Sequence, residues 1–120
     1  MGNIAFTSRT GNPDFDGVFD VSPEDVASAK ASDIVLIDVR EPSEFVGELG
    51  HIRDSELIVL HTLPEHLDRL PQDKTIVFIC KSGGRSARAA AFAQANGFNQ
   101  VYNMKGGMIL WNSKGLPVEK

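Results

Sequence analysis

Short apolar runs alternate with helix-forming segments along most of this chain. Five segments have the pattern of strands, and they lie at residues 18–21, 34–37, 56–59, 75–79 and 100–103. A continuous apolar run such as 75–79 is typical of a strand that is buried on both faces of a parallel sheet. Because strands and helices alternate at this pitch, the pattern predicts an α/β domain with a parallel sheet.

Segments with helix-forming features separate these strands. Ser22 followed by Pro23 is a typical helix start, and we expect this helix to end at residues 32–33. Leucines at helical spacing make residues 61–70 amphipathic. Alanine dominates residues 85–96, which suits a helix that packs closely against a sheet. Two further helices are expected to start at Pro42 and at Gly106–Gly107.

The N-terminal residues lack this regularity. Residues 1–17 show neither a period of 2 nor one of 3.6, and they include the turn-forming residues Gly2, Gly11, Asn12, Pro13 and Asp14. We therefore expect an irregular arm over residues 1–17 and one folded domain over residues 18–120. Phe6 and Phe15 are the side chains expected to pin the arm to the domain.

Composition narrows the function classes. A net charge of −4 without a basic block argues against nucleic-acid binding. A single cysteine excludes an internal disulfide and a cysteine-rich zinc site, and three scattered histidines show no metal-ligand spacing. No apolar run approaches the roughly 20 residues of a membrane span, and no signal-peptide pattern is present, so we expect a cytoplasmic protein.

The only cysteine, Cys80, directly follows the apolar run 75–79. Ligands of parallel sheets collect at the carboxyl ends of the strands, which is where this thiol falls. Gly83 and Gly84 can take backbone angles that other residues resist, so that successive N–H groups turn inward and bind an anion.

Positive charge surrounds the same thiol. Lys81 and Arg85 flank the glycine pair, and the following helix points its positive end at this loop. These features favour the thiolate, which is the nucleophilic form of cysteine. A lone cysteine is more often a small buried hydrophobic residue, but the two glycines and two cations beside Cys80 favour a reactive one.

These residues resemble a known family. The motif Cys-x-x-Gly-x-Arg-Ser at residues 80–86, with Asp38-Val39-Arg40 upstream and Gly106-Gly107 and Trp111 downstream, is similar to single-domain rhodaneses, which are sulfurtransferases. The resemblance runs from about Ser22 to the C-terminus. It implies that the five strands form one parallel sheet with helices on both faces. The chain departs from the family at Arg53-Asp54, where rhodaneses have Pro-Gly.

The resemblance also implies a reaction without a cofactor. Cys80 would take a sulfane sulfur from a donor such as thiosulfate, carry it as a persulfide, and pass it to cyanide, another thiol or a protein acceptor. The loop that would bind the donor consists of Lys81, Ser82, Gly83, Gly84 and Arg85, in which the lysine and arginine are candidates to bind an anion. Arg85 could instead tie the loop down. Asp38, Arg40 and Ser86 are expected to support the site.

The supporting pair has a structural interpretation. Asp38 ends a predicted strand, where its carboxylate is expected to accept hydrogen bonds from nearby N–H groups, and Arg40 is expected to fasten the next helix. Arg40 and Glu44 stand four residues apart and could form an ion pair. We favour this structural interpretation over a catalytic one.

Two alternatives stay open. A persulfide carrier or binding module, loaded and emptied by a partner protein, would have almost the same sequence. Cysteine-dependent phosphatases also place a cysteine before a loop that an arginine closes, but with five residues between them, whereas four separate Cys80 from Arg85. The sequence leaves the physiological donor, the acceptor and the oligomeric state undetermined, and it indicates no membrane partner.

Overall fold

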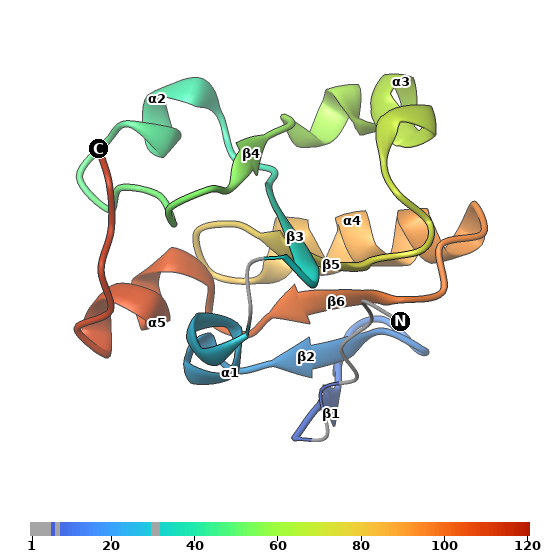
Figure 1. Ribbon diagram of the computed structural model, residues 1–120, viewed down its shortest axis with the longest axis horizontal. Coiled ribbons are helices and arrows are strands. Elements are labelled where there is room, and N and C mark those ends of the chain that lie inside the picture. The colour runs from blue at the N-terminus through green and yellow to red at the C-terminus, as the bar shows by residue number, and fades with distance from the viewer. Residues whose placement is uncertain (1–5, 7, 30–31) are drawn as a thin grey trace.

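A sheet of six strands forms the centre of the computed structural model, which describes residues 6, 8–29 and 32–120 (Figure 1). The strand order is β1-β2-β6-β5-β3-β4. All neighbouring pairs are parallel except β1 with β2. The strands are β1 (Thr10–Gly11), β2 (Phe19–Val21), β3 (Ile34–Asp38), β4 (Glu56–Leu57), β5 (Thr75–Ile79) and β6 (Val101–Met104).

The predicted parallel sheet is confirmed, but its strand count is wrong by one. The additional strand, β1, comes from the arm that was expected to be irregular, and it pairs antiparallel with β2. The side chain of Asn12 turns the chain back between them, because its Oδ1 accepts the N–H groups of Asp14 and Phe15. A strand of two exposed residues has no alternating pattern to detect. Residues 1–5 and 7 of the predicted arm lie outside the described residues.

Two predicted helices differ from the observed ones. The first helix ends at Ser28, because Ala29 has an extended backbone; residues 30 and 31 lie outside the described part. The segment expected to form one helix over 61–70 is broken into shorter turns. Pro64 has no N–H to continue an α-helical ladder from residue 60, so the segment begins with a 3₁₀ turn instead. The helices are α1 (Pro23–Ser28), α2 (Pro42–Phe45), η1 (Leu60–Thr62), α3 (Leu63–His66), η2 (Leu67–Arg69), α4 (Gly84–Ala95) and α5 (Gly107–Ser113).

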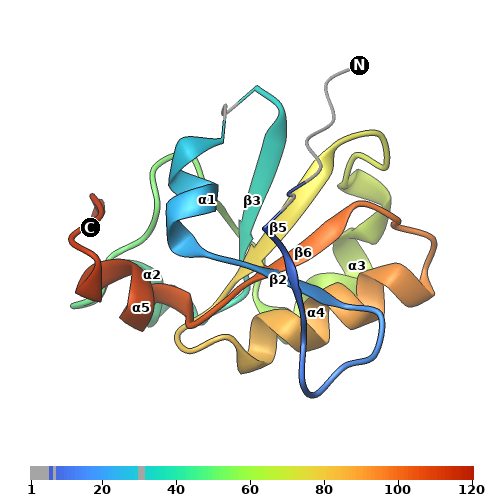
Figure 2. The ribbon, with the colours of Figure 1, turned by 90° about the horizontal axis from the view of Figure 1, so that it is seen from below.

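Helices cover both faces of the sheet, as predicted (Figure 2). Side chains of α3 and α4 pack on one face, and side chains of α1 and α5 pack on the other. Strand β5 is buried along its whole length, with Ile76 and Phe78 on the α4 face and Val77 and Ile79 on the α5 face. This central strand therefore anchors both cores and holds its carboxyl end in a fixed position.

The two phenylalanines of the arm pack as expected. Phe6 is buried and lies edge to face on Tyr102, with ring centroids 5.0 Å apart. Phe15 packs against the core on the α4 face. No helix in the described part of the chain is both long and apolar enough to cross a bilayer.

Candidate active site

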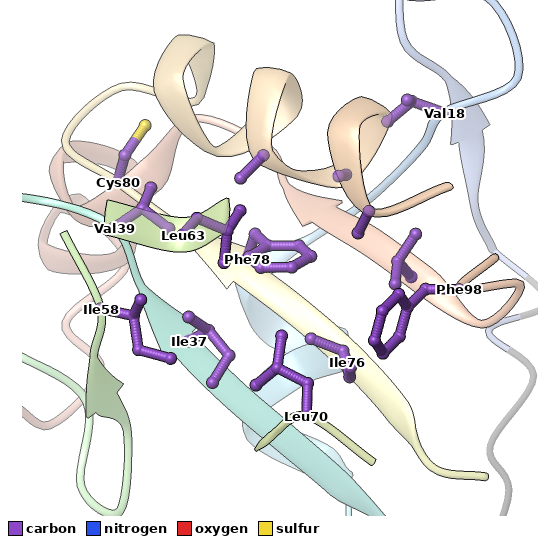
Figure 3. Packing of buried hydrophobic residues seen from close by; sticks show 14 residues of the cluster. Val18, Ile37, Val39, Ile58, Leu63, Leu70, Ile76, Phe78, Cys80 and Phe98 are labelled. Carbon is purple, nitrogen blue, oxygen red and sulfur yellow. The ribbon is translucent and has the colours of Figure 1, made fainter. Parts of the chain in front are cut away.

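Cys80 lies immediately after β5, at one end of the core cluster on the α4 face (Figure 3). The residue is only 1% exposed. The loop of residues 81–83 then leads into α4, so that the sulfur lies near the N-terminal end of that helix. The predicted order of buried strand, cysteine, loop and helix is thus present.

Two groups donate hydrogen bonds to the sulfur. The backbone N–H of Gly83 lies 3.0 Å from Cys80 Sγ, and the hydroxyl of Ser86 lies 3.2 Å from it. Ser86 is fully buried. Donors placed in this way stabilise negative charge on the sulfur, which a nucleophilic thiolate requires.

The two loop glycines have different roles. Gly83 has a φ of +106°, and a Cβ there would lie 3.3 Å from the backbone nitrogen of Gly106. Gly84 begins α4, and a Cβ there would meet no atom within 4 Å. Only Gly83 therefore needs to be glycine, and its unusual backbone is what directs its N–H toward the sulfur.

Helix α5 holds the loop from the other side. The N–H groups of Met108 and Ile109 donate to the carbonyls of Cys80 and Lys81, at 2.8 and 3.0 Å. Gly107 permits this approach, because a Cβ there would lie 2.5 Å from both carbonyl oxygens. The sequence analysis used Gly106-Gly107 as a helix start and as part of the family motif, but it did not predict this close contact with the loop.

Asp38 and Arg40 form a buried ion pair that does not touch the sulfur. Arg40 Nη2 lies 2.8 Å from Asp38 Oδ2, and both side chains are 1% exposed. The Asp38 carboxylate also accepts the backbone N–H of Arg40, and Arg40 Nη2 donates to the carbonyl of Gly50 at 2.7 Å. The guanidinium thus links the end of β3 to the segment that follows α2, whereas the structural interpretation expected it to fasten the helix itself.

Arg85 forms an ion pair with Glu44. Its Nη1 and Nη2 lie 2.8 and 2.9 Å from the two carboxylate oxygens of Glu44, in a bidentate geometry. These hydrogen bonds lower the pKa of Glu44 to about 2, although partial burial acts in the opposite direction. The same hydrogen bonds raise the pKa of Arg85. The predicted Arg40–Glu44 pair is wrong, because Arg40 is bound to Asp38 instead.

The remaining loop residues face outward. Lys81 and Ser82 are exposed, and Lys81 lines a groove of about 330 Å³ beside the loop. Glu48, Leu49 and Ile109 line the same groove. Lys81 is therefore exposed at this groove, while Arg85 fastens the loop to α2.

The departure at Arg53-Asp54 lies away from this loop. Asp54 has a φ of +67°, and the backbone N–H of Ser55 donates to the carbonyl of Ile52 at 3.0 Å. Aspartate tolerates this left-handed backbone, so the tight turn forms without glycine. Both residues line an apolar groove of about 470 Å³ that contains none of the loop residues 80–86.

One polar contact of the site was missed by the sequence analysis. The Ser86 hydroxyl lies within hydrogen-bond distance of Asn103 Oδ1 as well as of Cys80 Sγ. Asn103 is a buried polar residue of β6, and a buried amide inside a strand was the available signal. Among the described residues, no cluster of three His, Cys, Asp or Glu side chains is placed to hold a metal ion.

Known proteins match most of the chain. The Rhodanese-like domain family matches residues 22–114. A protein named sulfurtransferase from Allochromatium vinosum is 36% identical over 90 residues, which are 75% of this chain and 82% of that protein. The thiosulfate sulfurtransferase GlpE of Pseudomonas syringae is 34% identical over 93 residues, or 78% of this chain and 86% of GlpE.

A solved structure shows the same fold. It is a protein of unknown function from Rhodopseudomonas palustris that is described as a possible tyrosine phosphatase. It is 30% identical, its TM-score is 0.75, and the match covers 85% of each chain.

Proposed function

Because the chain belongs to the rhodanese-like domain family, we propose that it is a sulfurtransferase that moves a sulfane sulfur through a persulfide on Cys80. The observation that carries this proposal is the pair of donors on the cysteine sulfur, the N–H of Gly83 and the hydroxyl of Ser86. Both stabilise the anion that starts the reaction.

The reaction has two steps. The Cys80 thiolate attacks the outer sulfur of a donor such as thiosulfate, a bond forms between Sγ and that sulfur, and the sulfur–sulfur bond of thiosulfate breaks. The electron pair of the broken bond leaves with sulfite. A thiophilic acceptor, such as cyanide or a thiol, then attacks the outer sulfur of the persulfide and regenerates the thiolate.

The loop residues have distinct parts in this proposal. Lys81 attracts an anionic donor from the groove, whereas Arg85 fixes the loop to α2 through Glu44. The backbone N–H groups of residues 81–85 hold the outer sulfur as an anion. Because Cys80 is only 1% exposed, the site favours donors whose reactive sulfur is a slender terminal atom.

Intact-mass spectrometry tests the proposal directly. The protein is exposed briefly to thiosulfate and then to cyanide, with Cys80→Ser as the control. We expect a gain of one sulfur atom that cyanide removes and that the variant does not show. No adduct from thiosulfate, inorganic polysulfide or a persulfidated protein would overturn the proposal.

A second candidate function is a sulfur carrier that a partner protein loads and empties. Two exposed apolar side chains favour it: Val46 is 62% exposed and Ile109 is 48% exposed. Ile109 lines the groove at Lys81, and Val46 lies in sequence between the groove residues Glu44 and Gly47. Apolar side chains beside a reactive thiol suit contact with a protein surface. Steady-state assays with thiosulfate and cyanide separate the two functions, because a carrier would load once and stall.

A further inference from the structure

A chain of buried polar side chains leads away from the cysteine sulfur. Ser86 contacts both Cys80 Sγ and Asn103 Oδ1, and Asn103 Nδ2 donates to Asp20 Oδ1 at 2.9 Å. Exposure is 0% for Ser86, 2% for Asn103 and 6% for Asp20. The three residues come from α4, β6 and β2, so the contacts run from the helix to two neighbouring strands of the sheet.

Asp20 fixes the orientation of the Asn103 amide. Its carboxylate oxygen accepts N–H groups from Asn103 and from Asn12 of the arm, each at 2.9 Å. The opposite orientation of Asn103 would place its carbonyl oxygen against the carboxylate, with no hydrogen between them. The Asn103 carbonyl oxygen is therefore held toward Ser86.

The Ser86 hydroxyl carries one hydrogen but has two acceptors, Cys80 Sγ and Asn103 Oδ1. A hydrogen bond to an anionic acceptor is stronger than one to a neutral acceptor. When Sγ is a thiolate, the hydrogen is therefore best placed on the sulfur. When Sγ is the neutral inner sulfur of a persulfide, it accepts weakly, and the amide oxygen is the better partner.

We propose that Asn103, oriented by Asp20, is a positioning residue that accepts the Ser86 hydrogen bond while Cys80 carries its persulfide. Without this second acceptor, a fully buried hydroxyl would lose its strong partner each time the sulfur is loaded. The amide thus lowers the free energy of the loaded enzyme relative to that of the empty one. The inference rests on the proposed function, and it gives the bond between Asp20 and Asn12 of the arm a role in the site.

The effect is measured by the loading constant, which is the equilibrium constant for transfer of the outer sulfur from thiosulfate to Cys80. In the loading step, thiolate and thiosulfate give persulfide and sulfite, and the total charge is unchanged. The purified protein is equilibrated at one pH with fixed ratios of thiosulfate to sulfite. The loaded fraction is then read by intact-mass spectrometry, and thermal melting confirms that each variant is folded.

Two substitutions should shift this equilibrium in opposite directions. Asn103→Leu removes the second acceptor, so Ser86 can bond only to Sγ, and the loading constant should fall about fivefold. Ser86→Ala removes the donor that stabilises the thiolate, so the loading constant should rise about fivefold. The double variant should match Ser86→Ala alone, because Asn103 acts only through the hydroxyl.

Asp20→Ala provides a second variant should Asn103→Leu fail to fold. It frees the Asn103 amide to rotate, and the loading constant should fall in the same direction by a smaller factor. Asp16→Ala removes an exposed carboxylate from the same segment and should leave the constant unchanged.

The outcomes are distinguishable. If the unaltered protein never gains a sulfur, the proposed function fails. If it loads but Asn103→Leu and Asp20→Ala load to the same extent, or if Asn103→Leu has its full effect in the absence of Ser86, this inference is overturned. The inference would also be overturned if Ser86→Ala and Asn103→Leu shifted the loading constant in the same direction. That result is expected if both substitutions only disturb the structure of the site.

Discussion

Arg85 at the start of α4 is held by both carboxylate oxygens of Glu44 in α2, although the two stand 41 positions apart in the sequence. The pair fastens the loop around Cys80 to the segment that follows β3. The negative charge of Glu44 also neutralises Arg85, which the sequence analysis considered a candidate to bind an anion. Under the proposed function, this pairing leaves Lys81 as the loop cation that meets a donor at the groove.

Glu44→Gln should improve the binding of thiosulfate. The amide keeps one acceptor for Arg85 but removes the charge that neutralises it, so the potential at the groove becomes more positive. We expect KM for thiosulfate to fall about threefold at low ionic strength, with kcat little changed, and the effect to shrink with added salt. Steady-state kinetics measure this.

Glu48→Gln is the matched control for this substitution. It removes one negative charge from the same groove without freeing Arg85. Its KM should change less than that of Glu44→Gln. A KM that rises in Glu44→Gln would mean that fastening the loop matters more than the charge of Arg85.

The Glu44–Arg85 pair should stabilise the protein in a pH-dependent way. The pKa of Glu44 is lowered from 4.5 to about 2 in the folded state. Its contribution is therefore fully present above pH 4.5 and is lost as the pH falls toward 2. Because the pair is partly exposed to solvent, we expect only about 1 kcal/mol.

Urea unfolding of the unaltered protein and of Glu44→Gln checks this contribution. The difference in unfolding free energy should be largest at neutral pH and should disappear near pH 2. A difference that stays constant between neutral pH and pH 2 would contradict the assignment to this carboxylate.

The loop glycines allow a matched pair of substitutions. Gly83→Ala forces a side chain onto a backbone with φ of +106°, which costs about 1–2 kcal/mol, and it displaces the N–H that donates to the sulfur. We expect kcat/KM for sulfur transfer to fall at least about tenfold. Gly84→Ala stands on helical backbone in open space and should raise stability by about 0.5 kcal/mol without loss of activity.

Melting temperatures and kinetics of the two variants check this prediction. If both alanine variants keep full activity, the Gly83 N–H is not needed for the reaction.

Phosphatase activity should be negligible. The loop places four residues between Cys80 and Arg85, one fewer than in cysteine-dependent phosphatases. Arg85 also forms hydrogen bonds with both carboxylate oxygens of Glu44, so it is not available to bind a phosphate. We expect no turnover of p-nitrophenyl phosphate above background. Robust turnover that disappears in Cys80→Ser would show instead that the protein is a cysteine-dependent phosphatase.

The fold could be predicted from the sequence wherever a buried segment has a recognisable pattern of apolar residues. Strand β5 is buried at every residue, and its apolar run, followed at once by Cys80, located both the sheet and the candidate nucleophile. Strand β1 could not be found in this way, because its two residues are exposed and its pairing depends on the turn at Asn12. Pro64 was visible in the sequence, and its effect on the 61–70 segment was missed.

The site was predictable to the extent that its residues are neighbours in the sequence. Local spacing indicated an Arg40–Glu44 pair, but the tertiary fold brings Glu44 to Arg85. The contact between Ser86 and Asn103 spans 17 residues, and that between Asn103 and Asp20 spans 83. The spacing of neighbouring residues in the sequence cannot predict these two contacts, because they depend on the order of strands in the sheet.

The contact between α5 and the loop limits how the loop can change in length. The amides of Met108 and Ile109 are in register with the carbonyls of Cys80 and Lys81, and Gly107 leaves no room between them. Inserting one residue after Cys80 would move the second carbonyl out of this register. A longer, phosphate-sized loop would therefore have to be accompanied by a repositioned α5, so loop length and the start of this helix can change only together.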